Sequence, residues 1–175
     1  NQIKKNWVYV LGKKLESTIY DSAKGFIFPV PGFKKYFNRE FNNQLKKPMF
    51  DLINGISDDF LISTKDKDEK PHKRFTVLYS GNMGLSQGLE IIIEVAVLLK
   101  KYPIDFRLIG NGVCKNKLEK LAKIKKVDNI FFHNSINRFE LIKWIKKSSI
   151  CLVPLKNHSL FRSALPSKMF EYMAC

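Results

Sequence analysis

The first part of the chain carries a helical pattern followed by short apolar runs. Over residues 6–23, apolar side chains recur at helical spacing with Lys and Glu between them, which predicts an amphipathic helix. Residues 26–30 read as a buried strand, a second short helix is expected near Phe33, and a further apolar piece covers residues 50–53. The apolar positions of the first helix are Trp7, Val10, Leu11, Leu15, Thr18 and Ile19.

Beyond residue 75 the pattern becomes a regular alternation of strands and helices. Apolar runs predict strands at residues 75–79, 105–109, 130–133 and 150–153. The helical patterns between and after them cover residues 88–100, the stripe Leu118, Leu121 and Ala122, the stripe Phe139, Leu141, Ile142 and Ile145, and a last helix opening at Pro166. Such alternation predicts an α/β fold with a Rossmann-like parallel sheet, covered by helices on both faces.

A charged segment separates these two parts. Residues 57–74 lack a sustained apolar face, so we interpret them as a linker. A chain of 175 residues suffices for one domain and a remnant of another. We therefore expect a partial domain at residues 1–56, the linker at 57–74 and a parallel-sheet domain at 75–175.

The charge of the chain favours an anionic partner. Lys and Arg outnumber Asp and Glu by 31 to 16, which gives a formal charge of +15. The positive field suits nucleic acid, acidic lipid headgroups or a phosphorylated small molecule, and charge alone does not choose among them. A Lys-rich solvated surface without a partner is the alternative. The sequence carries no recognisable RNA-binding aromatic motif or Cys/His finger.

Other features of the sequence exclude a membrane-spanning helix and argue against a metal site. The longest apolar stretch, residues 85–99, is interrupted by polar side chains and falls short of the roughly 20 apolar residues that span a bilayer. Cys114, Cys151 and Cys175 are widely spaced, which suits reduced thiols in a cytosol. The chain starts at Asn1 without a leader pattern, so we expect it to be a piece of a longer protein.

Candidate chemistry lies in the loops that follow the predicted strands. In an open parallel sheet, ligands bind at the carboxyl ends of the strands, and backbone N–H groups at helix starts attract phosphate. The loop at residues 81–88 and the loop Gly110-Asn111-Gly112 occupy such positions, although ordinary turns explain them equally. Residues in these loops that could contact a ligand are Gly81, Asn82, Gly84, Gln87, Gly110 and Asn111.

A third candidate site lies at the start of the last helix. Ser167, Lys168 and Glu171 fall in its first turns, and the preceding loop carries Arg162 and Ser163. Ser167 and Glu171 are four residues apart, so they share one helical face. Free amides and positive charge could hold a diphosphate there while the carboxylate reaches ribose hydroxyls. A solvated helix end is the competing interpretation.

Four motifs together resemble the bacterial family-four glycosyltransferases. They are YSGNMGLSQGL at residues 79–89, ALPSKMFEYMA at residues 164–174, PGFKKY at residues 31–36 and NGISDDF at residues 54–60. The resemblance is closest to the subgroup that includes the fucosamine-type amino-sugar transferases of capsule and O-antigen synthesis. It covers nearly the whole chain, and the order and spacing of the motifs make it more specific than any single glycine loop.

The resemblance implies a GT-B architecture of two Rossmann-like lobes. Residues 1–56 would then be the end of the acceptor lobe, and residues 75–175 the donor-binding lobe, incomplete at its C-terminal end. The implied reaction transfers a sugar, with retained anomeric configuration and without a metal or other cofactor, from a nucleotide-sugar that is UDP-linked. The acceptor would be a cell-surface polysaccharide or a lipid-linked molecule.

The resemblance also implies roles for individual residues. Glu171 matches the glutamate that binds the donor ribose, Ser167 and Lys168 fall where helix-start amides hold the diphosphate, and backbone groups near Asn134 and Ile136 would hold the base. The chain departs from the pattern at three positions. The first glutamate of the family's pair is Ser163, and Asn82 and Gln87 stand where basic residues are common, so Arg162 and Lys168 would have to supply the missing charge.

Two other functions remain as alternatives. One is a non-catalytic module of donor-lobe shape that binds a protein partner or anionic lipid, and the other is a basic nucleic-acid-binding protein. We favour the transferase, and so expect no nucleic-acid partner, a cytoplasmic location and no turnover by the isolated fragment. The charge and the family's lipid-linked acceptors also suggest peripheral contact with the inner face of an anionic membrane. The catalytic residues stay unassigned.

Overall fold

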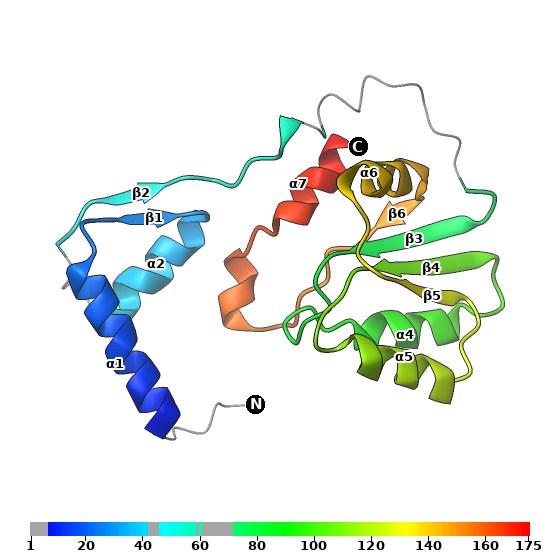
Figure 1. The fold of residues 1–175 in the computed structure, drawn as a ribbon, viewed down its shortest axis with the longest axis horizontal. Helices are drawn as coiled ribbons and strands as arrows, with labels where there is room; N and C mark the ends of the chain where they lie inside the picture. The colour runs from blue at the N-terminus through cyan, green and yellow to red at the C-terminus, as the bar shows by residue number, and fades with distance from the viewer. Residues whose placement is uncertain (1–6, 42–45, 59, 61–71) are drawn as a thin grey trace. The chain divides into compact units, whose positions relative to one another are not determined.

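The chain forms two compact units, divided between Asn54 and Gly55 (Figure 1). This is a computed structural model, and it describes residues 7–41, 46–58, 60 and 72–175, without the side chains of residues 31, 40, 160 and 163. Residues 59 and 61–71, which make up most of the predicted linker, lie outside the described residues.

The first unit has a short parallel pair of strands and two helices in its described part. Its elements are α1 (Trp7–Ser22), β1 (Phe26–Phe28), α2 (Pro31–Glu40) and β2 (Met49–Asp51). Phe26 pairs with Met49 and Phe28 with Asp51. The predicted strand at residues 26–30 therefore ends earlier than expected and is not buried throughout, since Ile27 is 65% exposed. Helix α2 begins at Pro31, because a proline ring suits the first turn of a helix.

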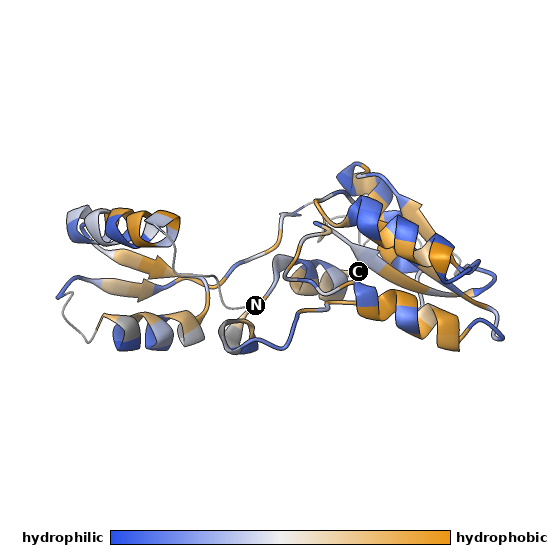
Figure 2. Ribbon diagram, turned by 90° about the horizontal axis from the view of Figure 1, so that it is seen from below, coloured by the Kyte–Doolittle hydropathy of each residue, from blue (hydrophilic) through white to orange (hydrophobic). Residues whose placement is uncertain are grey.

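Aromatic rings form the core of the first unit. The Phe37 ring lies 4.7 Å from that of Phe26 and 5.1 Å from that of Tyr20, centroid to centroid. Phe28 and Val30 are buried beside them. The predicted first helix is confirmed, but its apolar stripe is exposed: Trp7, Val10, Leu11, Leu15 and Ile19 are 48–76% accessible to solvent. Figure 2 shows hydrophobic colour on the two strands and on parts of both helices.

The second unit confirms the predicted α/β fold with a parallel sheet. Its strands lie in the order β5-β4-β3-β6, and each neighbouring pair is parallel. Strand β6 is shorter than the run of apolar residues suggested, because only two of its residues pair with β3. The elements are β3 (Phe75–Ser80), α4 (Glu90–Leu98), β4 (Ile104–Ile109), α5 (Lys115–Ile124), β5 (Ile130–His133), α6 (Arg138–Lys147), β6 (Ile150–Cys151), the 3-10 helix η1 (Ser159–Ser163) and α7 (Ser167–Ala174).

Helices cover both faces of this sheet. Successive apolar side chains of a strand point to opposite faces, so both faces must be buried. Val77 and Tyr79 of β3 pack on one face with residues of α4 and α5, whereas Leu78 packs on the other face with α6. Figure 1 shows α4 and α5 on one side of the sheet and α6 and α7 on the other. The helices carry alternating hydrophobic and hydrophilic segments in Figure 2, as expected for helices with one buried face.

Phe60 belongs to this core although it falls inside the predicted linker. Its side chain is 1% exposed and packs with Leu78, Ile109 and Ile142. Its amide donates a hydrogen bond to the carbonyl of Ser57 at 3.0 Å. Part of the segment that we interpreted as a linker is thus an integral piece of the second unit.

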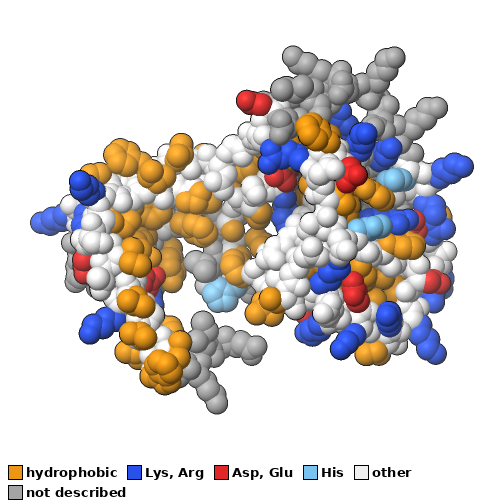
Figure 3. Space-filling model, viewed as in Figure 1, with side chains coloured by type: hydrophobic (Ala, Val, Ile, Leu, Met, Phe, Trp, Pro, Cys, Tyr) orange, Lys and Arg blue, Asp and Glu red, His pale blue; other side chains and the backbone are white. Residues whose placement is uncertain are grey.

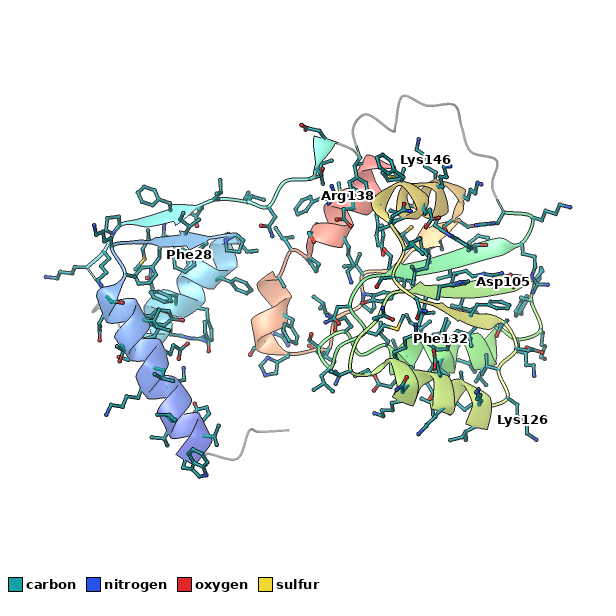
Figure 4. All side chains as sticks on the ribbon, viewed as in Figure 1. Phe28, Asp105, Lys126, Phe132, Arg138 and Lys146 are labelled. Carbon is teal, nitrogen blue, oxygen red and sulfur yellow. The ribbon has the colours of Figure 1, made fainter. Side chains whose placement is uncertain are left out.

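The carboxyl edge of the sheet is the side on which the loops after β3, β4 and β5 gather. In Figure 4, Arg138 at the start of α6 lies toward this edge, and Asp105 near the beginning of β4 lies at the opposite one. In the part of the chain that the structure describes, no helix is both long and apolar enough to cross a membrane.

Candidate functional site

Backbone hydrogen bonds join the loops at the carboxyl edge into one structure. The amide of Gly81 donates to the carbonyl of Ile109 at 2.9 Å, and the amide of Met83 donates to that of Asn111 at 2.8 Å. One strand further, the amide of Gly110 donates to the carbonyl of His133 at 3.1 Å. The loops after β3, β4 and β5, each predicted to contribute to the site, are therefore held together by backbone hydrogen bonds.

Two glycines make this close approach possible. Gly81 and Gly110 have φ angles of +130° and +142°, in a region that residues with a Cβ rarely adopt. A Cβ at Gly110 would collide with the carbonyl oxygen of Gly81 and would lie 2.9 Å from its carbonyl carbon. Gly81 and Gly110, which the sequence offered as candidate ligand contacts, thus have a structural role as well.

Lys115 connects the loops after β4 and β5 by hydrogen bonds, although the sequence did not suggest it as a site residue. Its ammonium group donates to the carbonyl of His133 at 3.1 Å, to Oδ1 of Asn134 at 2.6 Å and to Oδ1 of Asn111 at 3.2 Å. The Asn111 amide nitrogen also donates to Oγ of Ser135 at 3.2 Å. The two predicted ligand-contacting residues Asn111 and Asn134 thus share one cation. Asn111 and Asn134 are four and nineteen residues away from Lys115, and no sequence motif links residues at these distances.

One side chain of the first glycine loop is bonded within the loop itself. Oε1 of Gln87 accepts a hydrogen bond from the amide of Gly84 at 3.1 Å, so this side chain closes the loop. At the start of α4, the pKa of Glu90 is lowered chiefly because its carboxylate accepts a hydrogen bond from its own backbone amide. An anionic side chain therefore already occupies a helix start where we had expected phosphate.

Helix α7 is attached to the end of β3 by two of its side chains. The Tyr172 hydroxyl accepts a hydrogen bond from the Ser80 amide at 2.8 Å and lies 2.9 Å from Oγ of Ser80. The ammonium group of Lys168 donates to the hydroxyl of Tyr79 at 3.1 Å. Burial lowers the pKa of Lys168, and the nearby Glu171 opposes that effect. The start of α7 therefore brings a partly desolvated cation to the carboxyl edge of the sheet.

The remaining predicted residues differ in how closely the structure associates them with this edge. Ser167 is exposed in the first turn of α7, where its amide has no preceding helical carbonyl to bond, and Glu171 follows one turn later. Arg162 is exposed in η1, and it makes no hydrogen bond with the loops in the described part of the chain. Ser163 belongs to η1, and its side chain lies outside the described residues. Ile136 packs against the hydrophobic cluster under α6.

A large apolar groove also lies in this unit, but it contains none of the predicted site residues. It has a volume of about 460 Å³ and runs from the first residues of β3 and β4 along α4. Its lining consists of Phe75, Val77, Ile91, Ile92, Val95, Leu99, Ile104, Phe106, Ile150, Leu152, Val153 and Pro154. Because no charged or hydrogen-bonding side chain lines it, the groove does not suit a phosphorylated ligand.

On the α6 face, two histidines flank a tryptophan. The rings of His72 and His133 lie 5.0 and 5.5 Å from that of Trp144, centroid to centroid. Both Nε2 atoms are buried without a hydrogen-bond partner among the described residues. Burial lowers the pKa of each histidine, and the positive charge of Arg107 lowers it further. This arrangement therefore favours the neutral form of both rings.

We expect the second unit to lose stability as the pH falls below the ordinary histidine pKa of about 6.5. The unfolded chain takes up protons there before the folded chain does, whereas above this pH both states are neutral at His72 and His133. Urea midpoints at pH 5.5 and 7.5, followed by Trp144 fluorescence in a Trp7→Phe background, measure the loss. The double variant His72→Phe/His133→Phe should flatten the pH dependence, and His158→Phe, at an exposed position, should not. If stability depended on pH equally in the double variant and in the wild type, His72 and His133 would not be the cause of the loss.

The surface around the site is positive. Figure 3 shows Lys and Arg side chains surrounding the visible face of the second unit. Several are paired across helices, for example Lys117 with Glu90 and Lys125 with Glu94, each at 3.1 Å. Exposed pairs of this kind contribute little to stability. No group of three or more His, Cys, Asp or Glu side chains that could hold a metal ion is found in the described ranges.

Comparison with known proteins matches this chain to glycosyl transferases. The family model described as glycosyl transferases group 1 matches residues 62–175. A curated relative, described as the colanic acid biosynthesis glycosyl transferase WcaI of Escherichia coli (strain K12), is 29% identical over 119 residues. That match covers 68% of this chain and 29% of WcaI, so the chain spans less than a third of the relative's length.

Solved structures share the fold. TarM of S. aureus superposes with a TM-score of 0.62 at 20% identity, over 92% of this chain and 30% of TarM. The pneumococcal O-GlcNAc transferase GtfA, solved in complex with UDP and GlcNAc, gives a TM-score of 0.67 at 12% identity, over 88% of this chain and 29% of GtfA. At such identities the likeness is one of fold, and it agrees with the predicted GT-B type. The family model matches residues 62–175, which make up more than half of this chain. The chain therefore belongs to the group 1 glycosyl transferases.

Proposed function

We propose that this chain forms the nucleotide-sugar-binding part of a glycosyltransferase that uses a UDP-linked donor. The observation that carries the proposal is the convergence of Lys168, at the start of α7, with the glycine loop after β3. Helix-start amides, a desolvated ammonium group and closely approaching backbone are the features that recognise a diphosphate. The sugar would pass, with retained configuration, to a cell-surface polysaccharide or a lipid-linked acceptor.

Each predicted residue has a part in this proposal. Ser167 and Lys168 would bind the diphosphate, and Glu171 would accept hydrogen bonds from the ribose hydroxyls. Backbone groups near Asn134 and Ile136 would bind the base. Gly81, Asn82, Gly84, Gln87, Gly110 and Asn111 would shape the wall against which the donor lies, with Arg162 and Ser163 at its margin.

Two comparisons support a UDP-linked donor and a polysaccharide product. GtfA was solved with UDP, and WcaI is described as an enzyme of colanic acid biosynthesis. The motifs at residues 79–89 and 164–174 further support membership of the amino-sugar subgroup. Action at the inner face of the membrane would agree with a lipid-linked acceptor and with the charge of +15.

Catalysis would consist mainly of stabilising the departing diphosphate. Charge accumulates on the diphosphate as the bond to the sugar breaks, and a fixed cation with helix-start dipoles stabilises that charge without reorganising. Lys168 is the cation best placed for this in the described residues, because its hydrogen bond to the Tyr79 hydroxyl holds its ammonium group at the end of β3. No side chain of this chain is assigned as a catalytic base.

Calorimetric titration of the full-length protein with UDP and with GDP tests the proposal. We expect saturable binding of UDP and weaker binding of GDP. Failure to bind either nucleotide would refute the transferase function. Strongly salt-dependent binding of generic RNA or DNA together with indifference to UDP would instead favour the nucleic-acid alternative.

Substituting Glu171 by Ala should weaken UDP binding about tenfold or more, because hydrogen bonds to a charged group contribute about 1.5–3 kcal/mol. The affinity for pyrophosphate, which lacks the ribose, should not change. Glu94→Ala is the matched control, since Glu94 is exposed on α4 and paired with Lys125. An unchanged UDP affinity in the Glu171 variant would show that the ribose assignment is wrong.

A non-catalytic module of the same shape is the second candidate. Its support is the first glycine loop, because residues 81–88 contain no Lys or Arg that could meet a donor phosphate, and Gln87 is bonded to Gly84 within the loop. Such a module could bind a protein partner or anionic lipid. Transfer of sugar from a UDP-sugar by the full-length protein would exclude this candidate.

A further inference from the structure

Tyr79 lies in the core, but its hydroxyl makes contacts at the edge of the sheet. Its side chain is fully buried in β3, among residues of α4 and α5. Yet its hydroxyl reaches the carboxyl edge of the sheet, where it donates a hydrogen bond to the carbonyl of Asn82 at 2.6 Å. The same oxygen accepts a hydrogen bond from the ammonium group of Lys168 at 3.1 Å. One tyrosine therefore joins the glycine loop to the start of α7.

The Tyr79 ring holds the same ammonium group in a second way. Nζ of Lys168 lies 4.3 Å from the centroid of the ring, within the range of a cation–π interaction. The bond to Asn82 takes the hydroxyl proton of Tyr79, so a lone pair of its oxygen is directed to Lys168. The ammonium group is thus located by an acceptor and by the face of a ring.

Because Gly81 has no side chain, the end of the Lys168 side chain can pack against its backbone at the edge of the sheet. A Cβ at Gly81 would lie 3.0 Å from Nζ and 3.3 Å from Cε of Lys168. The ammonium group therefore lies against the backbone at the end of β3, where ligands of open parallel sheets bind. A free lysine side chain loses about 1.5–2 kcal/mol of conformational entropy when it is ordered, and here the folded chain has already ordered it.

We propose that Tyr79 is a positioning residue, which holds Lys168 over Gly81 as the cation that receives the diphosphate of a nucleotide ligand. This inference rests on the proposed function. It explains how a site whose first glycine loop carries Asn82 and Gln87 can still present a fixed positive charge. The positive charge is that of Lys168 in α7. Tyr79 of β3 holds it in place without touching the ligand itself.

A double-mutant cycle separates positioning from packing. Tyr79→Phe keeps the ring but removes the hydroxyl, and Lys168→Met keeps the length of the side chain but removes its charge. Both variants, the double variant and the wild type are prepared as full-length protein and titrated with UDP by calorimetry. Tyr102→Phe is the matched control, because Tyr102 is 55% exposed in the connection between α4 and β4.

We expect Lys168→Met to lower UDP affinity about tenfold or more, as loss of a charge-assisted hydrogen bond does. Tyr79→Phe should lower it severalfold, and the double variant should bind as Lys168→Met does, because residues in one network do not act additively. A purely structural role of Tyr79 would give losses that multiply in the double variant, which would overturn the inference. Tyr102→Phe should bind as the wild type does.

A second measurement needs no nucleotide. The Cε signal of Lys168 in a lysine-labelled sample reports the titration of its ammonium group. In Tyr79→Phe the group should turn toward solvent, and its titration should move to higher pH. An unchanged titration, or unchanged UDP affinity in Tyr79→Phe, would overturn the inference while leaving the proposed function intact. Absence of UDP binding in the wild type would instead refute the proposed function, and the inference with it.

Discussion

Replacing Gly110 by Ala should destabilise the second unit severely and abolish nucleotide binding with it. The φ angle of Gly110 is +142°, and residues with a Cβ pay about 1–3 kcal/mol to adopt such backbone conformations. The new methyl group would also meet the carbonyl oxygen and carbon of Gly81, which are backbone atoms that cannot rotate away. Forcing them apart costs about 1–3 kcal/mol more, as overpacking does.

The expected loss, roughly 2–6 kcal/mol in total, is a large part of the stability of an ordinary domain. Urea unfolding followed by Trp144 fluorescence in a Trp7→Phe background measures it. Gly84→Ala is the matched control, because a Cβ there would meet only the side-chain ends of Gln87 and Asn82, at 2.8 and 2.9 Å. These ends can move, so the control should lose far less stability. Equal losses in both variants would show that the approach of the two loops is not the cause.

The sequence pattern predicted the second unit well because its central strands, β3 and β4, are largely buried on both faces. Near-continuous apolar runs such as residues 75–79 occur where helices cover a parallel sheet on each side, so their length and spacing define the fold. The same reasoning worked less well in the first unit. Ile27 is apolar but exposed, and the apolar stripe of α1 is not buried within its own unit.

The site was harder to predict, because its parts come from distant positions and are joined by backbone groups. Motif spacing pointed to Lys168 and to the glycine loops. It could not reveal that Lys115 holds Asn111 and Asn134, since side-chain contacts across a sheet edge leave no periodic signal. Nor could it reveal that Gln87 bonds within its own loop, because the sequence gives the residue type but not its rotamer.

Tyr79 shows a different limit. It ends the apolar run that predicts a strand at residues 75–79, and its side chain is fully buried. Its hydroxyl nevertheless contacts Asn82 and Lys168 at the edge of the sheet. A buried tyrosine must find a partner for its hydroxyl, and the identity of that partner depends on the fold rather than on neighbouring residues.

Phe60 lies inside the segment that we interpreted as a linker, and Phe60→Ala tests that interpretation. A single aromatic residue in a charged segment carries no periodicity, although the side chain is 1% exposed against Leu78, Ile109 and Ile142. We expect this substitution to lower the free energy of unfolding of the second unit by about 3–5 kcal/mol, as removal of a buried phenylalanine ring usually does. The midpoint of urea unfolding, again followed by Trp144 fluorescence, measures the change.

Phe139→Ala supplies the control for Phe60→Ala, because the ring of Phe139 is 67% exposed on α6. The same chemical change there should alter stability by no more than about 0.5 kcal/mol. A loss below about 1 kcal/mol for Phe60→Ala, comparable to that of an average substitution, would mean that the segment behaves as a linker after all. A loss of stability as large as expected would place the start of the second unit before Phe60. A ring that stabilises the sheet must belong to the same folded unit.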